Sequence, residues 1–415
     1  MWLALGALAL MLHGCGGSSL SQSPVDAAGA GAGATTAGGG AAGVSGGSTM
    51  TAGGAVGDAG TGGVVAGGGA AAGMGGNMGG NAGSVAGGNA GSGACLGPPV
   101  AGVVQGWAAV DGMNQVATTG GGDLPPKTVT TLDAFKAAVI GDAPAVVYLN
   151  AVLPPAGIAV GSNKTIVGTC GAELHGHLGI SKAHNVIVRN LTIVGYGVGD
   201  CAKDPTYDAA VGCSSGDDAV SITSASHHVW FDHCDISDGT DGNLDINAGS
   251  DFVTISWTKF HYSLRADPVG NDSTGPSGHR FSNLIGSGDN VPEDVGHLNV
   301  TFHHDWWADN VNQRMPRTRR GKIHVVNNLY TSTGDKYCTN SGFEASLLVE
   351  NNVYSGVGNP LSPDANGDML ARNNLFTKTT GTTMAGGTGF TPPYTFTPED
   401  TAALEAAIRA GAGPH

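Results

Sequence analysis

The most regular pattern in the chain is a short segment rich in Val, Ile or Leu that ends in a polar or aromatic residue, most often Asn or His. Its copies are VIVRN ending at Asn190, VWFDH at His233, VTISW at Trp257, VTFHH at His304, HVVNN at Asn328, LVENN at Asn352 and LARNN at Asn374. The last four recur at a nearly constant interval, and His233 and Trp257 are separated by one such interval. The intervals from Asn190 to His233 and from Trp257 to His304 are each close to two periods.

A period of roughly 22 to 24 residues with β-branched strands and polar turns is typical of a parallel β-helix. Leucine-rich repeats have a similar period, but their leucine pattern is absent. We therefore predict an all-β fold, a right-handed parallel β-helix whose coils stack about 4.8 Å apart. Asn328, Asn352 and Asn374 should form a ladder that satisfies backbone groups at a bend, without a catalytic role.

Two helices are expected to cover this solenoid. The segment TLDAFKAAVIG, residues 131–141, is amphipathic, and Thr131 is placed to cap its N-terminus over the first coil. The segment TPEDTAALEAAIRAGAG, residues 397–413, has acids in its first turn, an arginine in its last turn and a glycine after it. We expect this second helix to pack on the flank of the solenoid.

The N-terminal part of the chain, residues 1–94, has a different composition from the rest. Residues 1–15 contain an apolar run that is too short to span a bilayer and is typical of a signal peptide. Leu12-His13-Gly14-Cys15 resembles a bacterial lipobox, which predicts lipidation of Cys15, and Gly16 favours the outer membrane. An ordinary secretory signal is the alternative. Residues 16–94 are mostly Gly and Ala and are predicted to be a disordered linker, which leaves 95–415 as the folded domain.

Charge and cysteine content narrow the possible partners. The formal net charge of −15 argues against nucleic acid. Six cysteines follow Cys15, and an even number in an exported chain predicts disulfide bonds. Cys201 and Cys213 flank one polar loop and are the best candidates for a pair. We expect a protein that is secreted or held at the cell surface and acts as a monomer.

Three aspartates are candidates for a metal site. Asp218 and Asp241 are one period apart, which places them on neighbouring coils at nearly the same position. Asp245 lies four residues later, two steps along the same strand face. Converging carboxylates repel one another unless a cation neutralises them, and hard oxygen ligands favour Ca²⁺. Asp217 and Asp238 are weaker candidates, and solvated turn aspartates are the alternative.

The stretch NQRMPRTRRG, residues 312–321, contains four arginines in an otherwise acidic chain. By the repeat count, this stretch lies three coils after Asp241 in the same region of the solenoid. An acidic metal site that faces arginines suits a polyanionic substrate, whose carboxylates arginine binds bidentately. A DNA-binding stretch would have interleaved aromatic residues and a helix to carry it.

The ordered set of motifs resembles the pectate lyases of polysaccharide lyase family one. The set comprises SNKTIVG, NVIVRNLTI, DDAVSI, VWFDHCDISDGTDGNLDI, SDFVTISWTKF, HLNVTFHHDWW and RMPRTRRGKIHVVNNLY. The resemblance implies cleavage of α-1,4-galacturonan, the pectate polysaccharide, by β-elimination. It also implies that Asp218, Asp241 and Asp245 are the primary calcium ligands.

In the same resemblance, Arg314 of the R-x-P-x-x-R motif matches the catalytic base and Arg319 the arginine that binds substrate, with Pro316 fixing the loop between them. Arg317 is a further candidate for binding substrate, and Arg320 for supporting charge. Calcium and arginine would neutralise the substrate carboxylate and so acidify the C5 proton. Because a guanidinium holds its proton strongly, a base of this type predicts an alkaline optimum.

One position departs from the family pattern. In H-x-K-x-x-L-I-G, the lysine that binds substrate is replaced here by Phe281. Arg280 or Arg265 could supply the missing charge, or the substrate could be more methylated, as in the related pectin lyases. A polygalacturonase-like hydrolase and a pectin-binding β-helix without activity are the remaining alternatives.

Overall fold

The structure is a computed structural model that describes residues 102–169, 171–197, 217–263 and 280–415. These residues belong to one structural unit, Gly88–His415. Several predicted features lie outside the described residues: the signal peptide, Cys15, the linker, the Cys201–Cys213 pair and Arg265. Of the cysteines inside them, Cys234 and Cys338 are buried free thiols. In the described part of the chain, no helix is long and apolar enough to cross a membrane.

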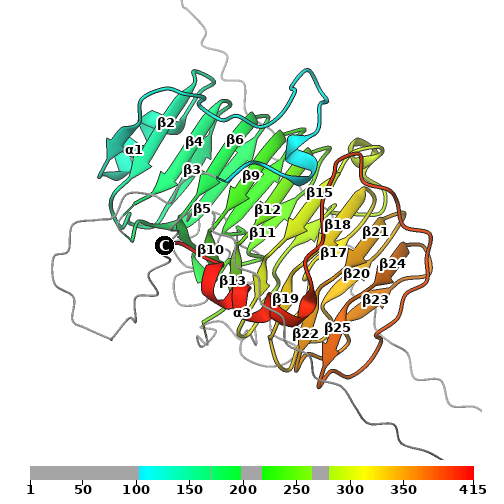
Figure 1. Cartoon of the computed structure of the whole chain (residues 1–415). Coiled ribbons are helices and arrows are strands. Elements are labelled where there is room, and N and C mark those ends of the chain that lie inside the picture. Colours follow the sequence, from blue (N-terminus) through cyan, green and yellow to red (C-terminus); the bar gives the residue numbers. More distant parts are fainter. Residues whose placement is uncertain (1–101, 170, 198–216, 264–279) are drawn as a thin grey trace, which may run out of the picture. The chain divides into compact units, whose positions relative to one another are not determined.

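The described chain winds into a parallel β-helix, as predicted, in which each coil adds one strand to each of three ladders (Figure 1). Each coil passes from ladder 1 to ladder 2, then to ladder 3, and returns to ladder 1 one level further along. Ladder 1 contains β1 (Lys127–Val129), β2 (Ala145–Leu149), β4 (Lys164–Gly168), β6 (His184–Arg189), β9 (His227–Asp232), β12 (Asp251–Ser256), β15 (Val300–His303), β18 (Lys322–Val326), β21 (Ser346–Glu350) and β24 (Asp368–Arg372).

Ladders 2 and 3 share the long strand β5 (Glu173–Ser181). Ladder 2 continues with β7 (Thr192–Val194), β10 (Asp235–Ser237), β13 (Lys259–His261), β16 (Trp306–Trp307), β19 (Leu329–Tyr330), β22 (Val353–Ser355) and β25 (Leu375–Thr377). Ladder 3 contains β3 (Ala156–Val160), β8 (Val220–Thr223), β11 (Leu244–Ile246), β14 (Leu284–Ile285), β17 (Arg317–Thr318), β20 (Thr339–Ser341) and β23 (Leu361–Pro363).

The repeated segments of the sequence are the strands of ladder 1, but two intervals were misread. β6 pairs directly with β9, and β12 pairs directly with β15. The long intervals that follow Asn190 and Trp257 are therefore single coils with insertions, and not two coils each. The insertion after Asn190 lies between ladders 2 and 3. The insertion after Trp257 is divided between that place and the turn from β14 back to ladder 1, which contains η4 (Pro292–Asp294). At both places a loop can lengthen without disturbing the strands that stack above and below it.

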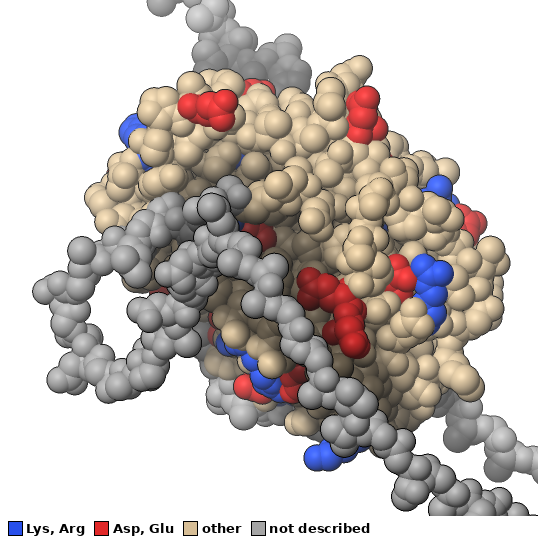
Figure 2. Space-filling model, viewed as in Figure 1, with Lys and Arg blue, Asp and Glu red and all other residues tan. Residues whose placement is uncertain are grey.

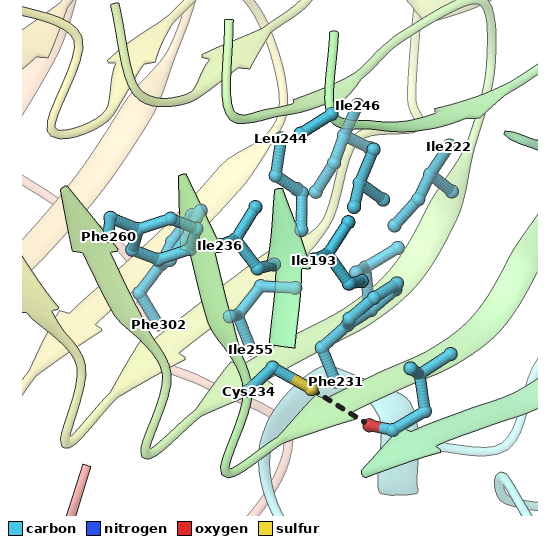
Figure 3. Close-up of a cluster of buried hydrophobic side chains, with 14 of the residues drawn as sticks. Ile193, Ile222, Phe231, Cys234, Ile236, Leu244, Ile246, Ile255, Phe260 and Phe302 are labelled. Carbon is cyan, nitrogen blue, oxygen red and sulfur yellow. Dashed lines mark hydrogen bonds between the residues drawn. The ribbon is translucent and has the colours of Figure 1, made fainter. Parts of the chain in front are cut away.

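The core runs along the axis of the solenoid and is filled by inward-facing aliphatic and aromatic side chains. Ile193, Ile222, Ile236 and Leu244 converge there from ladders 2 and 3 (Figure 3). Farther along, five aromatic rings stack on successive coils of ladder 2, with centroid separations of 4.2 to 5.7 Å; they are Phe260, Trp307, Tyr330, Tyr354 and Phe376. Equivalent positions therefore repeat the same contact, which is how a solenoid is stabilised by neighbouring coils.

The predicted asparagine ladder is confirmed at the bend between ladders 1 and 2. Asn352 Oδ1 accepts from Asn328 N–H, and Asn374 Oδ1 accepts from Asn352 N–H, both at 2.9 Å. The ladder extends beyond the predicted residues, because Asn328 Oδ1 accepts from Asp305 N–H and Asp305 Oδ1 accepts from Thr258 N–H, both at 2.8 Å. The residue before each rung has a positive φ, as at Asn327 (53°), which explains the paired asparagines.

Helices cover the solenoid at the two places that were predicted. In α1 (Leu132–Val139) Thr131 accepts a capping hydrogen bond from Ala134 N–H, and the helix buries Phe135 against the first coils. The later helix, α3 (Thr401–Gly411), packs on the flank against β19 and β22 (Figure 1). Its acids lie just before the helix and not in its first turn: Asp400 is the N-cap, and the first turn contains no acid.

The segment around α3 forms a strap along the outside of several coils. Tyr394 Oη lies 2.7 Å from Thr301 Oγ1, and Glu399 N–H donates to Asn327 Oδ1 at 2.9 Å. At the far end, His415 N–H donates to Asn190 Oδ1 at 2.7 Å. The strap therefore joins coils that are not neighbours in the stack.

Candidate active site

The acidic side chains predicted to form a site lie where ladder 2 passes into ladder 3. Asp245 is in the middle of β11, between the core residues Leu244 and Ile246, so its carboxylate points out of the solenoid. Asp218 lies two residues before β8, the neighbouring strand of ladder 3. On the face seen in Figure 2, charged side chains form small separate groups among uncharged residues.

Asp218 and Asp245 converge on the space above Gly242. A Cβ built on Gly242 would lie 2.8 Å from Asp218 Oδ1 and 3.1 Å from Asp245 Oδ1. Asp218 Oδ1 is buried and has no hydrogen-bond partner among the described residues, whereas Asp245 Oδ1 accepts from Leu284 N–H at 2.9 Å. The two oxygens thus face one small space that only a glycine leaves open.

Burial makes this acidic pair costly to ionise. Burial, followed by the charges of Asp245 and Asp241, raises the pKa of Asp218 well above its usual range, and Arg314 opposes the shift. Burial raises the pKa of Asp245 to about 7, again against the effect of Arg314. A cation between the two oxygens would offset both the cost of burying the two negative charges and the repulsion between them.

The position of Asp241 differs from the prediction. Leu244 is in register with Val220, so Asp218 is level with Gly242, and Asp241 with Asp217. Asp241 N–H lies 3.4 Å from Asp217 O, in the turn before β11, and not on the strand face of Asp245. The reason is that this coil is one residue longer than the interval between Asp218 and Asp241. Asp241 is still close enough to raise the pKa of both other aspartates.

The donor set fits a hard cation in part. Two carboxylates converge, one of them with an unpartnered buried oxygen. Among the described residues, no three His, Cys, Asp or Glu side chains are grouped as a complete metal site. Asp238 is used otherwise, because its carboxylate accepts from Ser263 N–H and Oγ–H at 2.8 and 2.9 Å.

Arg314 lies two coils after Asp241 and Asp245, not three, since β11, β14 and β17 are consecutive in ladder 3. The insertion in the coil after β12 caused the miscount. Arg314 O accepts from Asn283 N–H at 2.7 Å, and Met315 N–H donates to Cys338 O at 2.9 Å, which ties the loop to the coils on both sides. The Met315–Pro316 peptide bond is cis. The charge of Arg314 acts on both Asp218 and Asp245, so the predicted base and ligands do share one site.

The other arginines of the run separate into different environments. Arg317 is in β17, in register with Leu284, whose N–H binds Asp245. Arg319 Nε donates to Asp289 Oδ1 at 3.0 Å, and burial lowers the pKa of Arg319, helped by neighbouring Arg317. Arg320 is paired with Glu344, as expected for a supporting charge.

The position of the missing lysine has an unexpected environment. The Phe281 ring lies 4.1 Å from the guanidinium carbon of Arg314. Arg280, the predicted substitute for the lysine, is only 7% exposed. Sequence reasoning also missed Gly242 and Tyr337, the latter half-buried among the charges of Arg317 and Arg314. No residue pattern in the chain signals these contacts, although Gly242 directly follows a predicted ligand.

The fold and the site define a class: a parallel β-helix protein with buried carboxylates facing arginines across ladder 3. The family model described as pectate lyase matches residues 19–398. The chain therefore belongs to the pectate lyase family, and it is a polysaccharide lyase.

Relatives of known activity and solved structures agree with this assignment. Pectate lyase A of Aspergillus niger is 33% identical over 319 residues, covering 74% of this chain and 86% of the relative. Pectate trisaccharide-lyase of Thermotoga maritima is 37% identical over 181 residues, covering 43% of this chain and 42% of the relative.

The fold resembles that of a Bacillus subtilis pectate lyase mutant, with a TM-score of 0.60 and 22% identity, covering 77% of this chain and 98% of the other. It also resembles a pectate lyase of Bacillus sp. N165 in complex with trigalacturonate, with a TM-score of 0.59 and 23% identity, covering 75% of this chain and 99% of the other.

Proposed function

We propose that this lyase is calcium-dependent and cleaves α-1,4-linked galacturonan by β-elimination, leaving 4,5-unsaturated oligogalacturonates. The observation that carries the proposal is the convergence of Asp218 Oδ1 and Asp245 Oδ1 above Gly242, within range of the charge of Arg314. Such a site combines cation ligands with an arginine, which suits a polymer bearing one carboxylate per sugar.

In this proposal Asp218, Asp241 and Asp245 hold Ca²⁺. Bound calcium supplies positive charge that neutralises the carboxylate of the substrate and makes the neighbouring C5 proton more acidic. The buried, unpartnered Oδ1 of Asp218 and the open space above Gly242 support this assignment. Asp241 completes the ligand set from the turn before β11.

Arg314, in its neutral form, removes the C5 proton and becomes a guanidinium. The electron pair of that C–H bond forms the C4–C5 double bond, the C4–O bond breaks, and the leaving glycosidic oxygen takes a proton from water. Arg319 and Arg317 bind substrate carboxylates. Arg319 would exchange its hydrogen bond to Asp289, which measures 3.0 Å, for one to the polymer. Arg280, which is only 7% exposed, supplies the positive charge that the family lysine would bring at the neighbouring residue 281.

The test follows ultraviolet absorbance on polygalacturonate with calcium and then with a chelator. We expect a rise that the chelator abolishes, that is greatest at alkaline pH, and that Arg314→Lys lowers by orders of magnitude while Arg320→Lys does not. New reducing ends without absorbance would mean hydrolysis. Binding without turnover, unchanged by Arg314→Ala, would mean a protein that only binds pectin. Faster turnover of methylated pectin would mean a pectin lyase.

We further propose that the protein is exported and anchored by lipid at Cys15, with residues 16–94 as the tether that carries the 95–415 domain. The lipobox-like sequence before Cys15 and the Gly/Ala composition that follows support this. Cys15→Ser should move the enzyme from the membrane fraction to the soluble fraction. An unchanged distribution would favour an ordinary secretory signal.

A further inference from the structure

The guanidinium of Arg314 has an aromatic neighbour where a charged one is expected. Its Cζ lies 4.1 Å from the ring centroid of Phe281, within the range of a cation–π contact. Arg314 Nε is buried and has no hydrogen-bond partner among the described residues. The ring therefore lies over the guanidinium carbon and leaves the N–H groups, which donate in the plane of the guanidinium, to other partners.

Phe281 is itself held in place by the coil that carries the aspartates. Its carbonyl oxygen accepts from Tyr262 Oη–H at 2.8 Å and from Asn243 N–H at 3.1 Å, and Asn243 directly follows Gly242. On the other side, Phe281 forms a parallel bridge with Gln313, the residue before Arg314. Phe281 thus lies on the coil between the aspartates and Arg314, fixed to both.

We propose that Phe281 is a positioning residue for Arg314, which deepens, and rests on, the proposed function. The ring orients the side chain of Arg314 and stabilises the positive charge that this group gains when it takes the C5 proton, but it accepts no strong hydrogen bond. The nitrogen atoms of Arg314 therefore remain available to the substrate. A lysine at residue 281 would put an ammonium group beside Arg314 in place of the ring, and its charge would oppose the positive charge that Arg314 gains, so in this chain the position serves the base and not a substrate carboxylate.

The test compares Phe281→Leu, Phe281→Tyr and Phe281→Lys in the full chain with calcium. Phe343→Leu is a matched control, because the Phe343 ring lies 5.0 Å from the Arg320 guanidinium in a similar pair away from the aspartates. We expect Phe281→Leu to lower kcat about 3- to 30-fold, the size of a desolvated cation–π contact, with KM changed less than about two-fold. Phe281→Tyr should retain activity, Phe281→Lys should fall at least as far as Phe281→Leu, and Phe343→Leu should match the wild type.

A double-mutant cycle with Arg314→Lys separates positioning from general damage. If the ring acts through Arg314, Phe281→Leu should cost much less activity in the Arg314→Lys background, and melting temperatures should not follow the activities. The inference is overturned if Phe281→Lys is as active as the wild type, if Phe281→Leu and Phe343→Leu behave alike, or if KM carries the whole effect. A wild type that gives no ultraviolet-absorbing product would overturn the proposed function instead.

Discussion

Asp305 is an acid in a position that the next three coils fill with asparagine, and Asp305→Asn should stabilise the protein. Asp305 is fully buried, and its Oδ1 accepts from Thr258 N–H at 2.8 Å, but its Oδ2 has no hydrogen-bond partner among the described residues. On the next rungs, the side-chain amide donates to a carbonyl of the preceding strand, from Asn328 to Phe302 at 3.0 Å and from Asn352 to Val325 at 2.9 Å.

The size of the effect follows from this comparison. Ile255 is in register with Phe302, so the carbonyl group of Ile255 is placed to accept from a side-chain amide at residue 305, as that of Phe302 does from Asn328. The side-chain amide of an asparagine at residue 305 would donate to this carbonyl group, and its nitrogen would replace the unpartnered Oδ2. Satisfying a buried polar group contributes about 1 to 3 kcal/mol to the free energy of unfolding.

The increase in the free energy of unfolding that we expect from Asp305→Asn should also depend on pH. Burial raises the pKa of Asp305 well above its usual 3.8, so the folded state binds a proton that the unfolded state releases. The stability from that proton is fully present below about pH 3.8 and is lost as the pH rises toward the folded pKa. Asp305→Asn has no proton to lose, so its advantage should grow between pH 5 and pH 8.

Equilibrium unfolding in urea, followed by tryptophan fluorescence at both pH values, measures this difference. The reciprocal change Asn328→Asp is the matched control and should destabilise, more strongly at pH 8. The ladder argument fails if Asp305→Asn lowers the free energy of unfolding. It also fails if the effect of Asp305→Asn and the effect of Asn328→Asp are each the same at both pH values.

Three further predictions concern the candidate site, the stability of the fold at low pH and the strap. Gly242→Ala should lower calcium affinity by at least ten-fold in calorimetry, because its Cβ would fill the space between the carboxylates; Gly157→Ala, with nothing within 4 Å, should not. Burial lowers the pKa of His303 to about 3 from 6.5, so stability should fall as the pH drops below 6.5, and His303→Gln should reduce that slope by up to about 1.4 kcal/mol per pH unit in urea titrations; equal slopes would contradict this. Leu404→Ala, in the cluster beneath α3, should cost about 2 to 4 kcal/mol in urea unfolding, and a loss below about 1 kcal/mol would mean that the strap is not part of the cooperative unit.

The parts of the fold that depend on local repetition were predictable from the sequence. The strands of ladder 1, the rungs at Asn328 and Asn352 and the cap at Thr131 each follow from residue type and spacing. Asp305 and Thr258 continue the ladder with other residue types, so the pattern did not reveal them.

The candidate site was predicted in composition but not in geometry. Residue spacing cannot separate one long coil from two short ones, which misplaced Arg314 by a coil, and a small change of coil length moved Asp241 level with Asp217. The stacking of Phe281 on Arg314 joins residues of different coils through side-chain direction, which spacing does not encode.

The strap has a consequence for how the protein is made. Asn190 binds His415 through two hydrogen bonds, of 3.1 and 2.7 Å, although the two residues lie far apart in the sequence. Coils near Asn190 leave the ribosome long before their partner is synthesised, so they can stack on one another but lack this outer contact. The outer contact between Asn190 and His415 is therefore added to coils that have already been synthesised and can already stack.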